Sequence, residues 1–353
     1  MALPDFTFQS RTEYLSDLTE RFSHCGKGDH ITLMSMVFNP SVPMIQAMFS
    51  ELCAAASRGA AVTFITDGMT FTLAHGGKPG PLFFGNKPSA RALKPYDETY
   101  RQLEKLQKAG GQFFIVNQAA RAFANPYARR SHIKLALIND RVYIPTCNFD
   151  NQDNLDVIVS WQDGKTANWL SDIAQAIARC GNVREALQDN DITKKLHESM
   201  TLYIDCGVPK RSTIFEAALR NIDHASAVFL TCQYFPGGRT GQHLAAALRR
   251  GASVEAFYGH IRSHGLQTPG HWLYKLREQT RLPRSLFARG MKRYDIKLHA
   301  KVLVTDDTAM IGSHNFVTMG VNLGTAELAL EVRHQAFSQA LIAKTRQVLE
   351  PVA

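Results

Sequence analysis

An internal repeat constrains the fold of this chain more than any other feature of its sequence. The segment HIKLALINDRVYIPTCNF, which begins at His132, aligns without a gap on HAKVLVTDDTAMIGSHNF, which begins at His299. Self-similarity between distant segments indicates that one structural unit occurs twice in a chain. We therefore expect two halves with the same fold.

The segments before each repeat predict the same order of secondary structure. In the N-terminal half, DHITLMSMVF precedes MIQAMFSELCAAASRG and AAVTFITD; in the C-terminal half, DHASAVFLTCQYF precedes QHLAAALRRG and ASVEAFYG. An alanine-rich amphipathic run that ends in glycine, here at Arg58-Gly59 and Arg250-Gly251, is typical of a helix with its C-terminal cap. The β-branched run after each helix is typical of a buried strand. Strand, helix, strand indicates a sheet covered by helices.

This pattern predicts two α/β domains, which we place at residues 1–190 and 191–353. The polar segment EALQDNDITKKLHES lies where they meet. A further amphipathic segment, YDETYRQLEKLQKAGG, ends in a glycine pair and leads into the strand QFFIVN. Two stretches that contain glycine and proline, residues 75–88 and 260–272, are expected to be loops.

The composition is that of a well-packed globular protein with excess positive charge. Of the 353 residues, 45% are hydrophobic and 20% are charged, which argues against disorder. The net charge of +9 favours partners rich in phosphate, either nucleic acid or anionic lipid, without choosing between them. The start of the chain has no secretory signal pattern, and no window is apolar enough to span a bilayer. The six cysteines are scattered, so we expect buried, reduced thiols in a cytoplasmic protein.

The repeated segment gathers polar side chains that suit a phosphoryl group. YDIKLHAKVLV alternates with a period of two, so His299 and Lys301 are expected on one face of a strand. The turn-like DDT then predicts a hairpin whose return strand carries Ser313 and Asn315 on one face. The first repeat has the same layout, with His132, Lys134, Thr146 and Asn148.

Two such patches that face each other would surround one phosphorus atom. Lysine supplies a positive charge, and asparagine supplies neutral donors to phosphate oxygens. Histidine titrates near neutral pH, so one imidazole can attack phosphorus in line while the other protonates the departing oxygen. Each imidazole needs a partner that fixes its tautomer, and Glu327 and Asp156, each shortly after the asparagine of its repeat, are the candidates.

The remaining polar residues are expected to be structural or exposed, with one alternative left open. Asp306 either satisfies backbone donors at the hairpin turn or takes a direct part in the site. The other histidines are expected in loops or on the surface; they include His260, His264, His271 and His314.

HAKVLVTD followed by GSHN, from His299 to Asn315, resembles the H-x-K-x4-D and G-S-x-N signature of the phospholipase D superfamily. This signature is specific, and the likeness extends over both halves and most of the chain. The two Arg-Gly steps look like those of bacterial cardiolipin synthases. The resemblance implies two α/β halves, each a mixed sheet flanked by helices, related by a pseudo-twofold axis. It also implies one shared active site at their interface, with no metal and no other cofactor.

The resemblance assigns roles to the repeated residues. Catalysis in this superfamily passes through a phosphohistidine, so His132 would be the nucleophile and His299 the acid that protonates the leaving alcohol. Glu327 would orient His299, and Asp156 is the corresponding acidic residue of the first half. The phosphate would be held by side chains from both repeats, namely Lys134, Lys301, Asn148, Asn315, Ser313 and Thr146.

The first repeat departs from the family pattern at two places. Asn139 stands where the second repeat has Asp306, although Asp140 follows it, and PTCN replaces G-S-x-N. Tyrosyl-DNA phosphodiesterases, which belong to the same superfamily, also have asparagine at this position. Because His132, Lys134 and Asn148 are all present, we expect an active site.

The function that we favour is that of a phospholipid enzyme of the cardiolipin synthase, phospholipase D or phosphatidyltransferase kind. It would pass a phosphatidyl group from His132 to an alcohol or to water. An anionic phospholipid would be the substrate, and basic charge would support peripheral contact with a membrane. Apolar residues around the first Gly-Pro stretch either meet acyl chains or pack in the core; they are Phe71, Leu73, Leu82, Phe83 and Phe84.

Two alternatives remain open at this point. One is a nuclease or DNA-end-processing phosphodiesterase, which the net charge and the pair Arg129 and Arg130 beside His132 would fit, although no basic stripe interleaved with aromatic residues is present. The other is an inactive scaffold that binds lipid or nucleic acid, which would follow if the altered first motif had lost its chemistry.

Overall fold

The computed structural model describes residues 3–70, 90–117, 128–150, 154–259, 291–294 and 298–350. Both stretches that the sequence predicts as loops, residues 75–88 and 260–272, lie outside these residues. The same is true of the apolar residues proposed to meet acyl chains and of three of the histidines expected in loops, namely Phe71, Leu73, Leu82, Phe83, Phe84, His260, His264 and His271.

The N-terminal half is built on a seven-stranded mixed sheet with the order β1-β7-β6-β5-β2-β3-β4. The three strands β2, β3 and β4 are parallel, and the other pairs are antiparallel. The strands are β1 (Thr7–Ser10), β2 (His30–Ser35), β3 (Ala61–Asp67), β4 (Gln112–Val116), β5 (Leu135–Ile138), β6 (Arg141–Pro145) and β7 (Val157–Gln162). The helices are α1 (Arg11–His24), α2 (Pro43–Ser57), α4 (Ala90–Lys108) and α5 (Gly164–Cys180).

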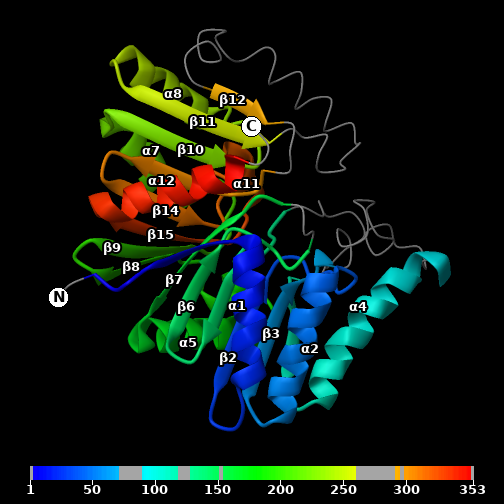
Figure 1. The fold of residues 1–353 in the computed structure, drawn as a ribbon. Coiled ribbons are helices and arrows are strands. Elements are labelled where there is room, and N and C mark those ends of the chain that lie inside the picture. The colour runs from blue at the N-terminus through cyan, green and yellow to red at the C-terminus, as the bar shows by residue number, and fades with distance from the viewer. Residues whose placement is uncertain are drawn as a thin grey trace.

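Alternation along the buried strands places helices on both faces of this sheet. Leu33 on β2 packs in one cluster with apolar residues of α1 and α2, whereas its neighbour Met34 packs in another with residues of α5. Successive side chains of a strand point to opposite faces, and both faces of β2 are apolar. The N-terminal half is therefore a three-layered α/β unit (Figure 1).

The C-terminal half repeats this arrangement in an eight-stranded sheet with the order β12-β11-β10-β13-β14-β15-β9-β8. Read from β12 to β9, it matches the first sheet strand by strand, from β4 to β1. Its strands are β8 (Ile192–His197), β9 (Met200–Asp205), β10 (Ala227–Cys232), β11 (Ser253–Gly259), β12 (Met291–Tyr294), β13 (Val302–Thr305), β14 (Thr308–Gly312) and β15 (Glu327–Arg333). Its helices are α7 (Thr213–His224), α8 (Arg239–Arg249), α11 (Thr318–Leu323) and α12 (Gln335–Leu349). The expected duplicated α/β fold with mixed sheets is confirmed.

The two Arg-Gly steps end helices in the same way in both halves. Gly59 and Gly251 have positive φ angles of 95° and 90°, which glycine adopts without steric cost. The arginine before each glycine donates to the last carbonyls of an adjacent helix. Arg58 Nε bonds to the Cys25 oxygen at 2.8 Å, and Arg250 Nη2 bonds to the Ile222 oxygen at 2.9 Å.

The polar segment between the halves is ordered. The short helix α6 (Val183–Ala186) is followed by β8 and β9, which pair as an antiparallel hairpin at the edge of the second sheet. The segment is polar because β8 is an edge strand whose side chains are only partly covered. We propose the boundary between the halves at residues 190 and 191, between α6 and β8.

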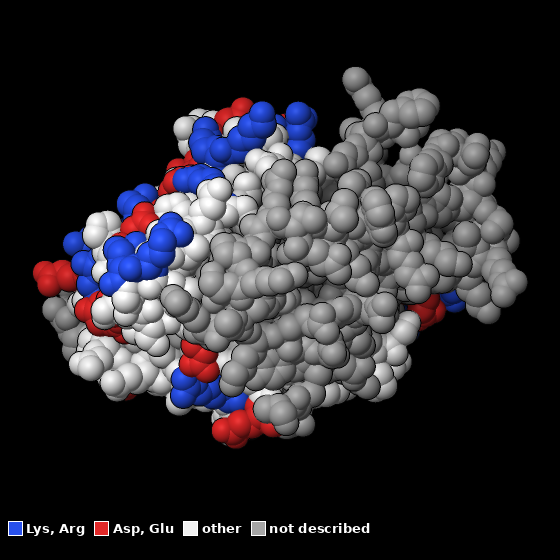
Figure 2. All heavy atoms as spheres, turned by 90° about the horizontal axis from the view of Figure 1, so that it is seen from above, with Lys and Arg blue, Asp and Glu red and all other residues white. Residues whose placement is uncertain are grey.

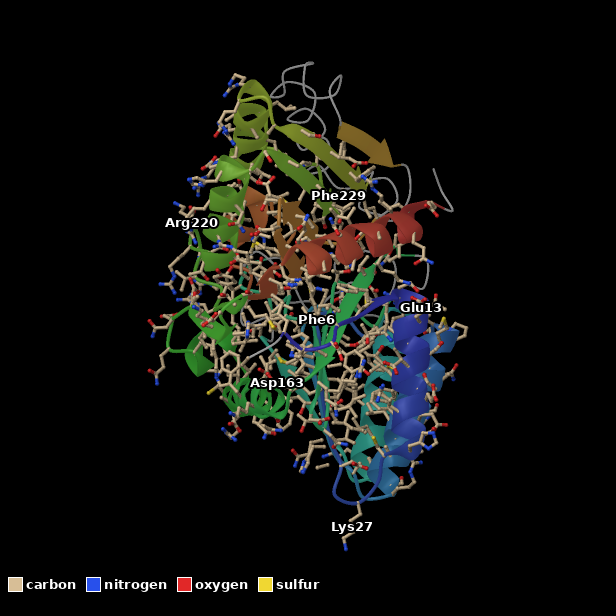
Figure 3. All side chains as sticks on the ribbon, turned by 60° about the vertical axis from the view of Figure 1, so that its left-hand side comes forward. Phe6, Glu13, Lys27, Asp163, Arg220 and Phe229 are labelled. Carbon is tan, nitrogen blue, oxygen red and sulfur yellow. The ribbon has the colours of Figure 1, made fainter. Side chains whose placement is uncertain are left out.

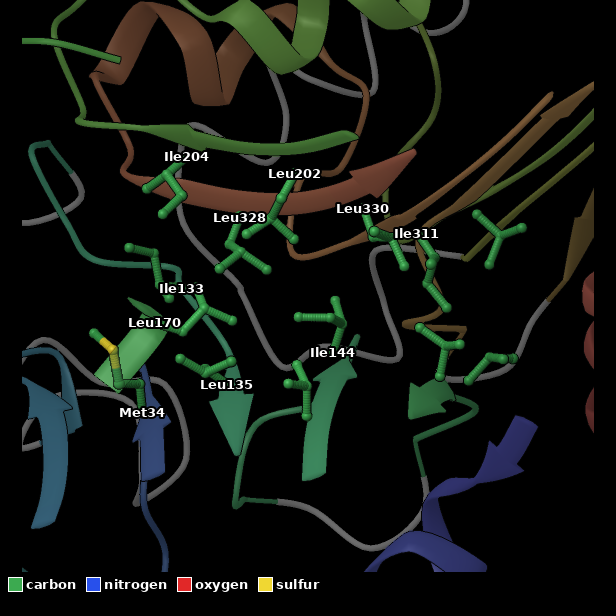
Figure 4. Packing of buried hydrophobic residues seen from close by; sticks show 14 of the residues in the cluster. Met34, Ile133, Leu135, Ile144, Leu170, Leu202, Ile204, Ile311, Leu328 and Leu330 are labelled. Atoms are coloured by element: carbon green, nitrogen blue, oxygen red, sulfur yellow. The ribbon is translucent and has the colours of Figure 1, made fainter. Parts of the chain in front are cut away.

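One hydrophobic cluster joins the two halves. It contains Leu202 and Leu328 from the C-terminal half and Ile133, Leu135 and Ile144 from the N-terminal half, all of them buried. Figure 4 shows these side chains facing one another between the sheets. Burial of each such side chain stabilises the folded state by about 1.5–3 kcal/mol, so the halves form one cooperative structure.

The two ends of the chain strengthen this joint. The ring of Phe6, just before β1, lies 4.7 Å from that of Phe337 on α12, in an edge-to-face arrangement. Lys344 of α12 also forms an ion pair with Glu13 of α1, with 2.7 Å between Nζ and Oε2. Figure 3 shows Glu13 at the end of α1 beside α12, whereas Lys27 lies beyond the opposite end.

All six cysteines are free. Four of them are buried and Cys53 is partly buried, but Cys180 at the end of α5 is exposed, so the expectation of buried thiols is wrong for Cys180. Among the described residues, no helix combines the length and the apolar character that crossing a membrane requires.

Candidate active site

The histidine and lysine of each repeat lie just before a strand rather than on it. β5 begins at Leu135 and β13 begins at Val302, so His132, Lys134, His299 and Lys301 all precede their strands. The prediction that they are strand residues is therefore wrong. The physical reason is that the backbone of each histidine is hydrogen-bonded to the opposite half instead of to a neighbouring strand of its own sheet.

Two isolated parallel bridges make these cross-half connections. Ser131 pairs with Ala326, and Leu298 pairs with Leu155. The His132 amide donates to the Ala326 oxygen at 2.8 Å, and the His299 amide donates to the Leu155 oxygen at 2.9 Å. In both cases the residue before the histidine is paired with the residue before an acidic side chain of the other half.

Each imidazole is consequently paired with the carboxylate of the opposite repeat. His132 Nδ1 lies 3.0 Å from both oxygens of Glu327, and His299 Nδ1 lies 2.8 Å from Asp156 Oδ1. The predicted pairing of Glu327 with His299 is wrong, because the bridges carry each acidic residue across the interface. Both acidic candidates do lie against a histidine of a repeat.

Burial fixes the protonation of these pairs. Burial lowers the pKa of His132 to about 4, against the attraction of Glu327. Burial alone would raise the pKa of Glu327, but the charge and hydrogen bond of His132 lower it to about 2. An ionised carboxylate beside a neutral imidazole accepts a hydrogen bond from the Nδ1–H group. The imidazole then has its proton on Nδ1 and its lone pair on Nε2. His132 therefore has the tautomer that a nucleophile requires.

The second pair has the same character. Burial and the neighbouring Lys301 lower the pKa of His299 well below its usual value. Burial would raise the pKa of Asp156, but the charge and hydrogen bond of His299 outweigh it and lower the pKa. Asp156 therefore stays ionised and fixes the tautomer of His299 in the same way.

Two buried lysines bond to the backbone oxygens of the histidines. Lys134 Nζ donates to the His132 oxygen at 3.0 Å, and Lys301 Nζ donates to the His299 oxygen. Burial lowers the pKa of Lys134 to about 8 and, together with the charge of Lys134, that of Lys301 to about 7. Lys301 also lowers the pKa of His132, and Lys134 that of His299, so the two repeats act on one another as parts of a single site.

The hydroxyl groups of the two repeats hold the carboxylates. Ser313 donates its only proton to Glu327 Oε2, and its oxygen accepts the Leu328 amide at 2.9 Å. Thr146 donates to Asp156 Oδ1 at 2.7 Å and accepts the Val157 amide at 3.1 Å. Both side chains are fully buried. In this structure each hydroxyl positions a carboxylate, and the predicted contact of Ser313 and Thr146 with a phosphate stays a prediction.

The contact of the asparagine amide groups with a phosphate stays a prediction, since the atoms that lack partners are their oxygens, which accept rather than donate. The amide oxygens of Asn148 and Asn315 are buried and have no hydrogen-bond partner within the described residues. Buried amides of this kind are almost always bonded in the presence of their ligands or water. Each asparagine closely follows the Thr146 or Ser313 that positions a carboxylate, so both amides belong to the same constellation.

Comparison with known proteins identifies this arrangement. Residues 218–349 match a family model described as cardiolipin synthase, PLD-like domain. They contain His299, Lys301, Asn315 and Glu327, whose counterparts in the first half complete the site described above. This segment of the chain, which carries the second repeat, is therefore similar to the phospholipase D-like domain of cardiolipin synthases. Curated proteins provide no match to the sequence.

Solved structures share the fold of this chain. Phosphatidylserine synthase from Haemophilus influenzae Rd KW20 has a TM-score of 0.73 at 14% identity, over 100% of this chain and 88% of that one. Polyphosphate kinase from Porphyromonas gingivalis has a TM-score of 0.55 at 13% identity, over 98% of this chain and 50% of that one. At such low identity, these likenesses are of fold.

The aspartate position of the phospholipase D motif is structural in both halves. Asp306 and Asn139 occupy the hairpin turns with positive φ angles of 52° and 54°, which both residue types tolerate. Asp306 accepts the Ala227 amide at 2.9 Å, and Asn139 accepts the His30 amide at 2.9 Å. Of the two roles left open for Asp306, the structure has the turn role.

The change from aspartate to asparagine is compensated within the first half. The Asn139 amide donates to Asp29, whereas Asp306 accepts from the Ser226 hydroxyl. The acidic residue of this pair is therefore Asp29, just before β2, in the first half, and Asp306, in the hairpin turn, in the second half. Asp140 accepts from Gln162 at the exposed end of the sheet. None of these turn residues contacts the histidines, so the altered motif leaves the site intact.

Three residues near the site were not anticipated. His314 is buried, contrary to the prediction, and accepts the Phe316 amide at 2.9 Å. Asp67 at the end of β3 holds the segment before His132, because it accepts the Ser131 amide at 2.7 Å and pairs with Arg130 at 3.2 Å. Arg11 is buried beside Asp156. A basic residue directly after Ser10, which caps α1 in the structure, is the one sequence signal that could have indicated Arg11.

Proposed function

We propose that this protein is a phosphodiesterase or phosphatidyltransferase that acts on phospholipids through a covalent phosphohistidine. His132 is the nucleophile, and His299 is the general acid and base. The observation that carries this proposal is the crossed pairing of two buried imidazoles with Glu327 and Asp156 around Lys134 and Lys301. Such a site leaves two Nε2 atoms for one phosphate, between two positive charges.

The comparisons support a phospholipid as the substrate. The family model that matches residues 218–349 is described as the PLD-like domain of cardiolipin synthase. The fold of phosphatidylserine synthase is similar over the whole chain. The net charge of +9 is compatible with an anionic headgroup. We therefore favour a phosphatidyl group as the unit that is transferred.

In the first step, the Nε2 lone pair of His132 attacks phosphorus and the bond to the leaving oxygen breaks. His299, as imidazolium, gives its Nε2 proton to that oxygen, so a neutral alcohol departs. The bound phosphodiester is an anion that offsets the charges of Lys134 and Lys301. Because these charges lower the pKa of His299 in the free site, substrate binding raises that pKa and protonates the acid.

In the second step, neutral His299 takes the proton of an acceptor hydroxyl, and the acceptor oxygen attacks phosphorus. The bond between phosphorus and His132 Nε2 breaks, which returns His132 to its neutral form. With water as acceptor the result is hydrolysis, and with an alcohol it is transfer. Glu327 stabilises the positive charge on the phosphorylated imidazole throughout, because its carboxylate accepts a hydrogen bond from the Nδ1–H group at 3.0 Å.

The structure weakens the support for a nuclease. Arg130, one of the two arginines beside His132, is buried in an ion pair with Asp67 instead of facing a nucleic acid. Over the described part of the face in Figure 2, lysines and arginines are interspersed with acidic residues rather than gathered in one stripe. An inactive scaffold would have no need of two complete histidine and carboxylate pairs.

The test is an activity comparison combined with trapping of the intermediate. The protein is incubated with phosphatidylglycerol vesicles or with single-stranded DNA, each with EDTA, and the products are separated. We expect lipid products only, an acid-labile phosphorylated enzyme in the wild type, none in His132→Ala, and a slowly turned-over adduct in His299→Ala. Cleavage of DNA alone would favour the nuclease, and binding without products would favour the scaffold. Full activity in either variant would remove the two-histidine mechanism.

A further inference from the structure

Arg11 occupies a position that is costly for a buried cation. It is the first residue of α1, directly after the cap Ser10, and its side chain is 3% exposed. The positive end of the helix dipole disfavours a cation there, and burial disfavours it further. Its Nε and Nη2 atoms have no hydrogen-bond partner within the described part of the chain. Helix formation does not explain this residue.

The contacts of Arg11 lead into the active site. Its Nη1 donates to the backbone oxygen of Asn148 at 3.0 Å and forms ion pairs with Asp156 Oδ2 and Asp150 Oδ1, both at 3.6 Å. Asp156 uses its other oxygen, Oδ1, for His299 and Thr146. The carboxylate that holds His299 therefore shares its negative charge with a permanent cation.

The other carboxylate has no such partner among the described residues. Both oxygens of Glu327 face His132, and Oε2 also accepts from Ser313, a neutral group. In the second half, the first residue of α7 is Thr213, whose hydroxyl and amide both bond to Asp205 at 2.8 Å. The pseudo-twofold symmetry of the site is broken at Arg11.

We propose that Arg11 is a positioning residue that differentiates the two histidines, making His299 the stronger acid and leaving His132 as the nucleophile. A carboxylate that shares its charge with a guanidinium holds the proton of its imidazolium less strongly. His299 then releases its proton to the leaving oxygen more readily than His132 would. This inference rests on the proposed function, because it assigns the acid role within that mechanism.

The charges that surround the pair define how the effect is measured. Asp156 faces His299, Arg11 and both lysines, with the Cys147 thiol nearby, and His299 faces Lys301 and Lys134 as well. Asp150 shares the Arg11 guanidinium with Asp156. If Arg11 loses its charge while the others stay, Asp156 holds the proton of His299 more strongly. The alkaline limb of kcat, which reports the protonated acid in the enzyme–substrate complex, then moves to higher pH.

The experiment compares Arg11→Met, Arg11→Lys and Arg58→Met. Arg58, the residue after α2, is the matched control. Its side chain bonds to backbone oxygens at the C-terminal end of α1, away from the site. For Arg11→Met we expect the alkaline limb of the kcat profile to move to higher pH by about half a pH unit or more. We also expect slower formation of the phosphorylated enzyme. Arg11→Lys keeps the charge and leaves the limb close to its wild-type position, and Arg58→Met lowers the melting temperature without moving the limb. An unshifted limb in Arg11→Met, or an equal shift in Arg58→Met, would overturn the inference.

A second measurement does not depend on catalysis. Histidine NMR follows the protonation of His299 in the wild-type protein and in Arg11→Met, with the resonances assigned by means of His132→Ala and His299→Ala. We expect His299 to take up its proton at a higher pH in Arg11→Met than in the wild type, and an unchanged pH would contradict the role of Arg11. Absence of any phospholipid activity in the wild type would instead reject the proposed function, while the NMR comparison would still report on Arg11.

Discussion

Glu327 lies against His132, the histidine of the opposite half, with both of its carboxylate oxygens 3.0 Å from the imidazole Nδ1. His299 and Asp156 form the reciprocal pair. Neither half holds a complete histidine and carboxylate pair by itself. A functional site therefore requires that the halves be docked, and the shared hydrophobic cluster provides that docking.

The crossed pairs predict which chemical step each acidic residue supports. In Glu327→Gln, the imidazole of His132 loses the negative charge that stabilises its phosphorylated form, and the rate of adduct formation is expected to fall by about 100-fold to 10,000-fold. In Asp156→Asn, breakdown of the adduct is slowed as well, because His299 no longer has its charged partner. Rapid quench with acid-labile phosphate counting separates the two effects. Glu331→Gln on the same strand, where the carboxylate bonds to Asn221, is the matched control and retains activity.

The hydroxyl of Ser313 is expected to matter for both stability and rate. Ser313→Ala removes a donor to a buried carboxylate, which destabilises the protein by about 1–3 kcal/mol. The less firmly held Glu327 lowers kcat roughly tenfold, the equivalent of about 1.4 kcal/mol in the barrier. Chemical unfolding and steady-state kinetics measure the two effects. Ser338→Ala, a buried serine on α12 that bonds to the Asp307 oxygen, is expected to change stability only. Equal kcat in both variants would contradict the positioning role.

Anion binding is expected to weaken as pH rises. The pKa of Lys301 is about 7 and that of Lys134 about 8 in the free site, because burial disfavours their charges. A bound anion raises both pKa values, so binding takes up protons above pH 7 and affinity is lost as pH increases further. Sulfate, whose charge is constant over this range, is expected to bind about threefold to tenfold more weakly per pH unit.

Isothermal titration in buffers of different ionisation enthalpy counts the protons taken up with sulfate. Lys301→Met removes one of the two sites of uptake and flattens the pH dependence. Lys195→Met on the edge strand β8 is the control, because that exposed side chain lies outside the site. An affinity for sulfate that stays constant from pH 6 to pH 9 would contradict the predicted ionisation of the lysines.

Restoring the motif aspartate in the first half is expected to destabilise it. Asn139→Asp replaces the hydrogen bond to Asp29 by repulsion between two carboxylates, at a cost of about 0.5–1 kcal/mol for this exposed pair. The double variant Asp29→Ser with Asn139→Asp recreates the arrangement of Ser226 and Asp306 and recovers the loss. Unfolding measurements on the cycle of four proteins test this, and activity is expected to stay unchanged in all four.

Much of the fold and many residues of the candidate site could be predicted from the sequence. Strand and helix periodicity, glycine caps and the gapless repeat are local patterns, and they predicted the duplicated α/β halves and brought His132 and His299 forward as partners. The turn role of Asp306 was one of two local alternatives. Local patterns could not assign Ser313 and Thr146, because a hydroxyl at the end of a strand serves a ligand or a carboxylate equally well.

The pairing within the site was decided by tertiary structure. Ser131 pairs with Ala326 and Leu155 with Leu298, and these bridges carry each acidic residue to the histidine of the other half. Arg11 reaches Asp156 because α1 begins beside the end of the first hairpin, which no nearby sequence pattern indicates. Such contacts depend on how two sheets dock through a buried interface, since side chains more than a hundred residues apart meet only when the whole chain is folded.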